Sequence, residues 1–284
     1  MKTKFNFLSF LSIFFIFGQS YAQDLNQPGY STFRDTRIIN GHSVETSRAG
    51  NLKFIIQHRF GSVKDGAYNL WGLDDSTIRL GLDYGFSNRF TVGIGRSSFN
   101  KTYDGYLKYR ILVQNQKSPL SITYLGAMAI IGLKKEEFNF EVTFNDRLTY
   151  THQLLIARKF GDKFSLQLMP SLVHRNTIMA EGNNQNDVFS IGSAIRYQLF
   201  KFLAITGEYY YTLPDQLQEG YNNSVSVGFE IETKGHVFQL HLSSSRGMIE
   251  PYFIAGTTGD FFNGDIHLGF NISRDFKLKG KKYH

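Results

Sequence analysis

The stretch Ile78-Arg-Leu-Gly-Leu-Asp-Tyr84 decides the fold, because apolar and polar side chains alternate along it. Its even positions are apolar, whereas Arg79 and Asp83 stand at odd positions. Residues two apart on a strand lie on the same face of a sheet, so the stretch predicts a strand with one apolar and one polar face. A polar second face suits the interior of a membrane barrel better than a soluble core.

The same alternation recurs along the chain and predicts twelve strands joined by long and short connections in turn. An even number of strands returns both chain ends to one side of the membrane. The predicted fold class is therefore all-β, a transmembrane antiparallel up-and-down barrel. The strands are expected at about 52–60, 78–84, 90–95, 107–113, 120–131, 148–156, 164–172, 189–197, 203–211, 225–231, 238–242 and 266–272, with short turns near 85–89, 115–119, 161–163, 200–201 and 233–235.

Aromatic side chains gather beside the short turns. A ring of aromatic residues at one membrane face is typical of transmembrane barrels, and a soluble β-sandwich has no reason to collect them at one end of its strands. The residues are Tyr84, Phe86, Phe90, Phe160, Phe164, Tyr197, Phe200 and Phe202.

The first 22 residues predict a cleaved signal peptide: Lys2 and Lys4 precede the apolar run Phe5–Phe17, and Ala22 ends a small-x-small cleavage site. Beyond it, no apolar run approaches the roughly 18 residues of a spanning helix. We expect a periplasmic N-terminal segment at 23–50, an outer-membrane barrel at 51–276 and a basic tail at 277–284. The expected location is the outer membrane, with its lipid as one partner.

Composition narrows the chemistry. The formal charge of +7 falls to +5 without Lys2 and Lys4, and Lys277, Lys279, Lys281 and Lys282 leave only +1 for the rest, so a nucleic-acid partner is disfavoured. The chain has no Cys, which excludes disulfides, a thiol nucleophile and Cys-ligated metals. No cofactor is expected.

Four segments carry a resemblance to a known family: Asn40–Thr46, Arg79–Gly85, Gly93–Gly105 and Leu148–Arg158. Together they resemble an uncharacterised family of outer-membrane β-barrel proteins found in Bacteroidota, over almost all of the mature chain. The resemblance implies the fold and the location. It implies no activity and no site residues.

Assigning the apolar face to lipid leaves a set of polar residues for the lumen. Basic residues concentrate on the first, second, fourth and eighth predicted strands, and acidic residues on the ninth and tenth. Opposed charged walls could select polar solutes, or the charges could pair with one another and fill the interior. The predicted lumen residues are Lys53, Arg59, Arg79, Asp83, Lys108, Arg110, Arg196, Glu208, Glu230, Glu232, Gln239, His241, Asp265 and His267.

A hydrolase was also considered, because twelve-stranded outer-membrane phospholipases use a His-x-Ser pair with an Asn. His241-Leu-Ser243 has this spacing and Asn271 lies on the last strand. Both side chains should face the lumen, away from lipid, and the Asn-Gly that follows the Ser in those enzymes is Ser244-Ser245 here. We therefore predict no catalytic residues.

A metal ion held by His241, His267 and Asp265 is the less favoured interpretation of three lumen hydrogen-bonding groups. The adjacent His42 and Ser43 would face opposite ways on a strand and form no catalytic pair. The pair Gly93 and Gly95 lies in strand wall rather than in a phosphate loop.

Four further features make structural predictions. Pro170 lies within a strand and predicts a bulge or a lost ladder bond. The alternating run from Phe138 to Phe144 predicts that the strand after it extends beyond the membrane. His152 falls on the lipid face, and Trp71 is expected to cap the barrel mouth in preference to touching lipid.

The function expected from this sequence is a passive channel or carrier for small solutes. Two other classes stay open: a non-conducting structural or partner-binding barrel, which would recruit a periplasmic or surface protein, and a lipid-processing enzyme. Residues 23–50 could enter the lumen as a plug, lie along the periplasmic rim or bind a partner.

Overall fold

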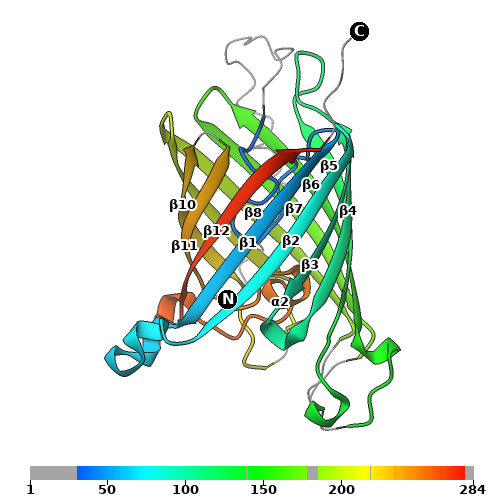
Figure 1. The fold of residues 1–284 in the computed structure, drawn as a ribbon, viewed down its shortest axis with the longest axis vertical. Helices are drawn as coiled ribbons and strands as arrows, with labels where there is room; N and C mark the ends of the chain where they lie inside the picture. The colour runs from blue at the N-terminus through cyan, green and yellow to red at the C-terminus, as the bar shows by residue number, and fades with distance from the viewer. Residues whose placement is uncertain (1–30, 139, 178–184, 218, 234, 279–284) are drawn as a thin grey trace, which may run out of the picture.

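In the computed structural model the chain forms a closed antiparallel barrel in which each strand pairs with its neighbours in sequence (Figure 1). The structure describes residues 31–138, 140–177, 185–217, 219–233 and 235–278; the predicted signal peptide and most of the basic tail lie outside them. The twelve strands are β1 (Asn51–Ser62), β2 (Ser76–Ser87), β3 (Phe90–Ser97), β4 (Tyr103–Leu112), β5 (Ser121–Ile130), β6 (Leu148–Phe160), β7 (Phe164–Arg175), β8 (Asp187–Phe200), β9 (Leu203–Thr212), β10 (Val225–Thr233), β11 (His236–Ser243) and β12 (His267–Lys277).

The barrel closes through β1 and β12, where Asn51 pairs with Lys277 and Gln57 with Asn271. The first strand therefore begins, and the last strand ends, at the same end of the barrel. We call it the short-turn end, and the opposite end the long-loop end (Figure 1). The predicted number of strands and their antiparallel order are confirmed.

The connections depart from the predicted rhythm at one place. Between β3 and β4 only residues 98–102 connect the strands, whereas the turn between β4 and β5 spans 113–120. The second expected long connection is thus the shorter of the two, because β3 and β4 both extend further toward the long-loop end than the apolar alternation indicated.

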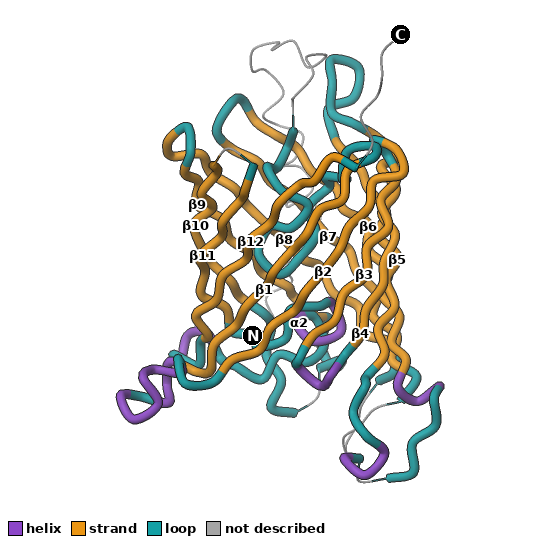
Figure 2. Tube along the Cα trace, viewed as in Figure 1, coloured by secondary structure: helices purple, strands orange, loops and turns teal. Residues whose placement is uncertain are grey.

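Short helical turns lie in the connections, mostly at the long-loop end (Figure 2). No helix among the described residues is long and apolar enough to cross a membrane. The turns are η1 (Val63–Asp65), η2 (Ala67–Gly72), η3 (Phe99–Lys101), η4 (Lys135–Glu137), η5 (Asn145–Arg147), α2 (Glu250–Phe253) and η6 (Phe261–Asn263).

Alternation along each strand separates an exposed apolar outer face from a buried inner face. On β2 the exposed Leu80 and Leu82 alternate with the buried Arg79 and Asp83, as the sequence predicts. Aromatic rings contact one another beside the short turns, for example Tyr84 with Phe86 and Phe160 with Phe164. The belt of aromatic residues that the sequence predicts beside the short turns is therefore present at the short-turn end.

The ladder between β6 and β7 is interrupted at Pro170. Gln153 pairs with Ser171 and Ile156 with Leu168, but the two residues between them on each strand form no register pairs. Pro170 has no N–H to donate, so the predicted loss of a ladder bond is confirmed. Pairing with β8 continues unbroken across the proline.

Two predictions about the long connections are wrong. The described residues of 131–147, which leave out 139, form no strand; they contain η4 and η5, and β6 begins only at Leu148. Trp71 does not cap the mouth: η1 and η2 stand beyond the rim of the barrel, and the indole is 54% exposed (Figure 1). Local alternation could not reveal that the mouth is filled by another segment.

Candidate functional site: the filled lumen

The lumen is occupied by residues 31–50, which we call the N-terminal plug (Figure 2). Arg37 and His42 form an antiparallel bridge, and the N–H of Ile38 donates to the carbonyl of Gly41, so the plug turns back on itself within the barrel. Ile39 and His42 are fully buried. Of the three places expected for this segment, the structure selects the lumen, and the described part is not a free periplasmic segment.

Glu208 on β9 holds the tip of this turn. Its carboxylate accepts from the backbone N–H of Ile39 at 2.8 Å, of Asn40 at 3.0 Å and of Gly41 at 3.1 Å. A carboxylate that accepts several N–H donors satisfies backbone groups that would otherwise be buried unpaired. The side chain of Asn40 reaches further and donates to the hydroxyls of Ser226 at 3.0 Å and Ser243 at 3.2 Å.

Ion pairs attach the plug to the wall on both sides of its turn. Asp35 accepts from the ammonium of Lys53 at 2.5 Å and from the hydroxyl of Ser273 at 2.5 Å, so one carboxylate binds β1 and β12 together. Glu45 pairs with Arg110 of β4. Such buried pairs offset the cost of removing each charge from water only when both members are present.

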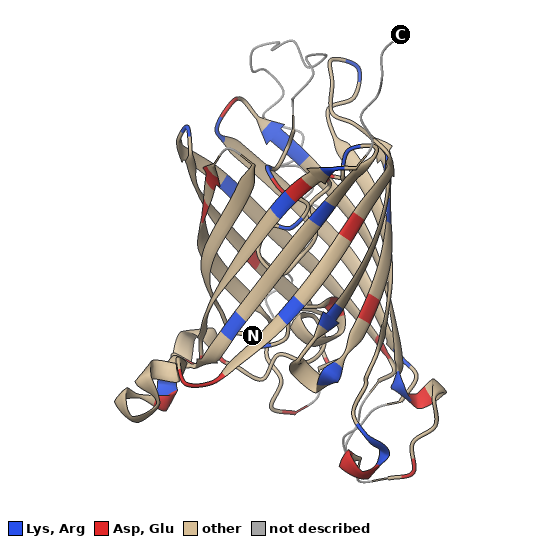
Figure 3. Ribbon diagram, in the orientation of Figure 1, with Lys and Arg blue, Asp and Glu red and all other residues tan. Residues whose placement is uncertain are grey.

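One side of the interior is apolar. Leu125, Leu155, Met169 and Val173, from β5 to β7, point inward and are fully buried. They join a cluster with the plug residues Phe33, Ile38 and Val44. The lumen is therefore asymmetric, with an apolar cluster on β5 to β8 and most of the buried charged side chains of the wall on β1, β2, β4, β9 and β10. Figure 3 shows where the charged residues lie along the chain.

A second segment enters from the long-loop end. Residues 244–266, which we call the inward loop, carry α2 into the barrel, where Phe253 packs on the ring of Tyr210 at 4.9 Å between centroids. Thr212 donates to the carbonyl of Ile254 at 3.2 Å, and Tyr252 shares a 2.5 Å hydrogen bond with Thr102. The loop is fixed to the wall at several points.

The plug and the inward loop meet at Glu250. Its carboxylate lies 3.5 Å from the guanidinium of Arg37 and 3.5 Å from the imidazole of His42. Tyr106 lies beneath both: its ring centroid is 4.4 Å from that of His42 and 5.5 Å from the guanidinium carbon of Arg37. At 3.5 Å the contact of Glu250 with Arg37 is an ion pair rather than a hydrogen bond, and its contact with His42 is a long polar contact, so the plug and the inward loop are joined only at long range here.

Most of the predicted lumen charges lie on the inner face and have partners. Arg196 pairs with Glu230 at 2.7 Å, and Arg79 pairs with Asp104. Asp83 accepts from Tyr106, and Lys108 donates to the carbonyls of Ser43 and Glu45. Of the two interpretations of the charges, mutual pairing and filling describes this conformation.

Glu232 and Asp265 lie toward the ends of the lumen, whereas Gln239 lies midway along β11. Glu232 is partly exposed and pairs with Arg34 at 2.6 Å. Gln239 donates to the carbonyl of Arg37 at 3.0 Å. Asp265 stands before β12, where it accepts from Ser62 at 2.8 Å, rather than on the strand itself.

The His-x-Ser pair has other partners than a catalytic pair would have. His241 contacts Arg59, and Ser243 bonds to Ser226 at 2.8 Å. Asn271 donates to Gln239 and to the carbonyl of Ile39, each at 2.8 Å. All three side chains face the plug, away from the outer face of the barrel.

The three groups considered for a metal ion do not converge. His267 pairs across the ladder with Ser243, whereas His241 lies opposite Gly269. Within the described ranges no three His, Asp or Glu side chains come close enough to hold a metal ion.

A polar recess of about 240 Å³ opens at the short-turn end, beside the first described residue of the plug. Asp162 and Gln198 contribute to its lining. Four cationic residues also line it: Arg34, Lys159, Arg196 and Lys201.

These features agree with the comparison with known proteins. Residues 33–276 match the family described as a membrane-bound beta barrel domain (DUF5777). The chain belongs to this family. The match begins within the plug and ends in β12, so it covers the plug together with the barrel. The outer face of the barrel is accordingly the lipid-facing face.

Several solved barrels are similar in shape. The NanC porin is 10% identical with a TM-score of 0.49, covering 80% of this chain and 100% of that one; the KdgM porin is 11% identical with a TM-score of 0.48, covering 80% and 99%. Outer membrane phospholipase A from Escherichia coli is 10% identical with a TM-score of 0.44, covering 81% and 91%. Similarities this low carry no argument about activity. No curated protein matches the sequence.

Sequence reasoning missed the residues that the plug and the inward loop contribute. Asp35, Arg37, Glu45 and Glu250 all bind within the lumen, yet none lies on a strand. A signal for the inward apolar wall was present: Leu154 and Leu155 are consecutive and break the alternation, as do Tyr124 and Leu125.

Proposed function

We propose that the protein is an outer-membrane channel or carrier for small solutes, closed in this conformation by the N-terminal plug and the inward loop. We infer that the short-turn end faces the periplasm, as the short turns of bacterial outer-membrane barrels do, so the plug enters the barrel from the periplasmic side. Export through the predicted signal peptide and insertion among outer-membrane lipids follow from the same proposal.

The observation that carries the proposal is the polar attachment of the plug. Glu208, Lys53, Arg110 and Lys108 hold it through hydrogen bonds and ion pairs. Water can replace such contacts when the plug withdraws, and the exposed wall would then present charge to a solute. If the wall were apolar on all sides, water could not replace the contacts that the plug makes with it.

Conductance through planar bilayers tests this proposal. The full mature chain is expected to open rarely, and a variant lacking residues 23–50 is expected to conduct steadily. Heat-dependent gel mobility of both proteins shows that each barrel has folded. If the deleted variant shows no conductance at any voltage, the channel proposal is wrong.

A disulfide can hold the plug in place, because the chain has no Cys of its own. The hydroxyls of Thr32 and Ser121 are 3.4 Å apart, which suits a bridge between Thr32→Cys and Ser121→Cys. Since residue 50 continues into β1, fixing residue 32 secures both ends of the plug. The oxidised variant should lose the rare openings, and reduction should restore them.

The apolar cluster favours a second candidate, a non-conducting structural or partner-binding barrel. Phe33, Ile38 and Val44 are buried against the inward wall, and burying such a side chain contributes roughly 1.5–3 kcal/mol. A permanent filling would use contacts of this kind. In that case the full chain shows no openings, nor does the double-cysteine variant after reduction, and only the variant lacking residues 23–50 conducts.

A further inference from the structure

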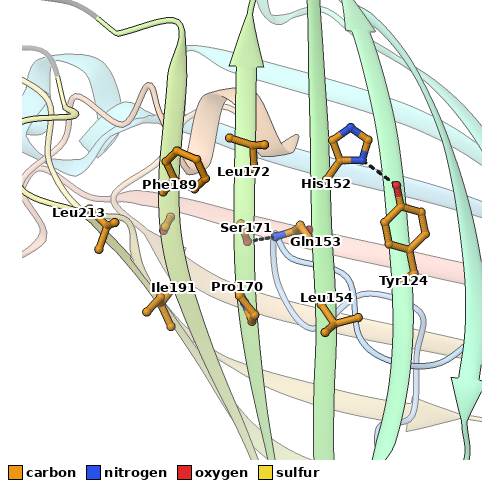
Figure 4. A pocket seen from close by; sticks show the side chains of 11 residues that line it. Tyr124, His152, Gln153, Leu154, Pro170, Ser171, Leu172, Phe189, Ile191 and Leu213 are labelled. Atoms are coloured by element: carbon orange, nitrogen blue, oxygen red, sulfur yellow. Dashed lines mark hydrogen bonds between the residues drawn. The ribbon is translucent and has the colours of Figure 1, made fainter. Parts of the chain in front are cut away.

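A groove lies on the lipid-facing wall, outside the lumen. Its volume is about 420 Å³, and it extends from β5 to β8 (Figure 4). Aliphatic and aromatic side chains form most of its sides: Leu154, Pro170, Leu172, Phe189, Ile191 and Leu213. This groove does not depend on whether the lumen conducts.

The groove follows from the interrupted ladder. Gln153 and Ser171, which also line it, point their side chains inward, where the Gln153 amide donates to the Ser171 hydroxyl at 2.7 Å. At these two positions β6 and β7 contribute backbone to the floor of the groove, at the level where Pro170 lacks an N–H. An acyl chain offers this backbone no hydrogen bond, so its fit rests on the apolar side chains that form the sides of the groove.

A polar pair marks one end of the groove. His152 lies on the lipid-facing side of β6 and shares a 2.7 Å hydrogen bond between its Nδ1 and the hydroxyl of Tyr124 (Figure 4). Within the described part of the chain no partner is found for its Nε2. His152 pairs with Leu172, two residues nearer the long-loop end than Leu154. The polar end of the groove therefore faces the long loops, and the apolar end faces the middle of the membrane.

We propose that this groove binds one acyl chain of a membrane lipid from the leaflet on the long-loop side. The chain lies along Leu154, Pro170 and Ile191, and the ester or amide group at its head accepts or donates a hydrogen bond at His152. This arrangement matches an amphipathic ligand in both polarity and direction. A polar solute or a protein surface would leave the apolar sides of the groove or the imidazole without a suitable partner.

Native mass spectrometry of the folded full mature chain in detergent, titrated with a diacyl phosphatidylethanolamine, tests the proposal. The protein should retain a lipid adduct. Ile191→Trp, which fills the groove, should weaken lipid retention at least about tenfold, equivalent to about 1.4 kcal/mol. The matched control is Ile195→Trp, on the same strand and the same exposed face but outside the groove, and it should retain lipid as the parent does.

The polar end is tested by His152→Leu, with His174→Leu at the rim as its control. His152→Leu should reduce retention of the ester-linked lipid but not of an ether-linked analogue with weaker acceptors. If Ile191→Trp fails to fold, Leu172→Phe fills part of the same groove. The proposal is wrong if the parent protein retains no lipid, or if the groove-filled and control variants retain it equally.

Discussion

At the scale of single residues, the interior is held by polar groups with several partners each. Glu208 accepts from three backbone N–H groups of the plug, whereas the partly exposed Glu232 pairs with the guanidinium of Arg34. Buried carboxylates with several donors contribute far more than exposed ion pairs, because water competes with the latter. The two glutamates therefore form a natural comparison.

Replacing Glu208→Ala should loosen the tip of the plug. Three backbone donors would be left buried without an acceptor, and we expect the local opening free energy to fall by on the order of 3 kcal/mol. Hydrogen exchange at the amides of Ile39, Asn40 and Gly41 measures this change. Glu232→Ala should alter it by less than about 1 kcal/mol. Equal effects of the two changes would contradict the role assigned to Glu208.

A pair of glycines on opposite faces makes a second comparison. A Cβ on Gly93 would enter the ring of Tyr106, which contacts Asp83 and His42, whereas a Cβ on Gly105 meets nothing nearer than 3.8 Å. Overpacking costs roughly 1–3 kcal/mol. Gly93→Ala should lower the unfolding temperature in detergent, and Gly105→Ala should leave it nearly unchanged. If Gly93→Ala leaves the unfolding temperature unchanged, the ring of Tyr106 can move to another position, which would contradict the close packing described here.

At the scale of elements, strand patterns are reliable where one face meets lipid and fail where no membrane enforces them. The alternation in β2 predicts its inward and outward faces correctly. The same alternation between Phe138 and Phe144 belongs to a connection, in which η5 turns the chain instead. Alternation is a local property, whereas strand pairing requires a partner at the same height, and β5 ends at Ile130.

The connection before β6 should respond to pH. The hydroxyl and N–H of Thr143 and the hydroxyl of Thr177 donate to Asp146 at 2.6–2.7 Å, which lowers the pKa of this carboxyl below its ordinary value of 3.8. Its folded pKa lies below the unfolded value, so its contribution is present above that value and is lost as the pH falls through the lowered pKa. Exchange at the Thr143 amide should accelerate there relative to other loop amides. Asp146→Asn should abolish this dependence.

At the scale of the whole molecule, the barrel could be predicted from sequence and its contents could not. A two-residue period, counted along twelve segments, specifies which side chains face lipid. Nothing local specifies that Asn40 contacts Ser243 or that Arg37 lies beside Glu250, because these contacts join segments about 200 residues apart.

Removing residues 23–50 should leave the barrel closed but less resistant to heat. The β1–β12 ladder needs no part of the plug, so far-UV spectra should remain rich in β structure. The inward apolar cluster and the lumen charges would lose their partners, so the folded band should disappear at a lower temperature. An unchanged transition temperature would mean that the plug contributes nothing to stability.

The double attachment of Asp35 also bears on how the barrel assembles. The ladder that closes the barrel joins Asn51 to Lys277, and contacts so distant in sequence form slowly because chain entropy opposes them. The carboxylate of Asp35 accepts hydrogen bonds from Lys53 on β1 and from Ser273 on β12, the two strands that close the barrel. A nascent open sheet that has already captured this carboxylate holds its two free edges near each other. The segment that fills the finished lumen is thus also placed to hold the two edges together while the seam closes, although the β1–β12 ladder itself contains no residue of the plug.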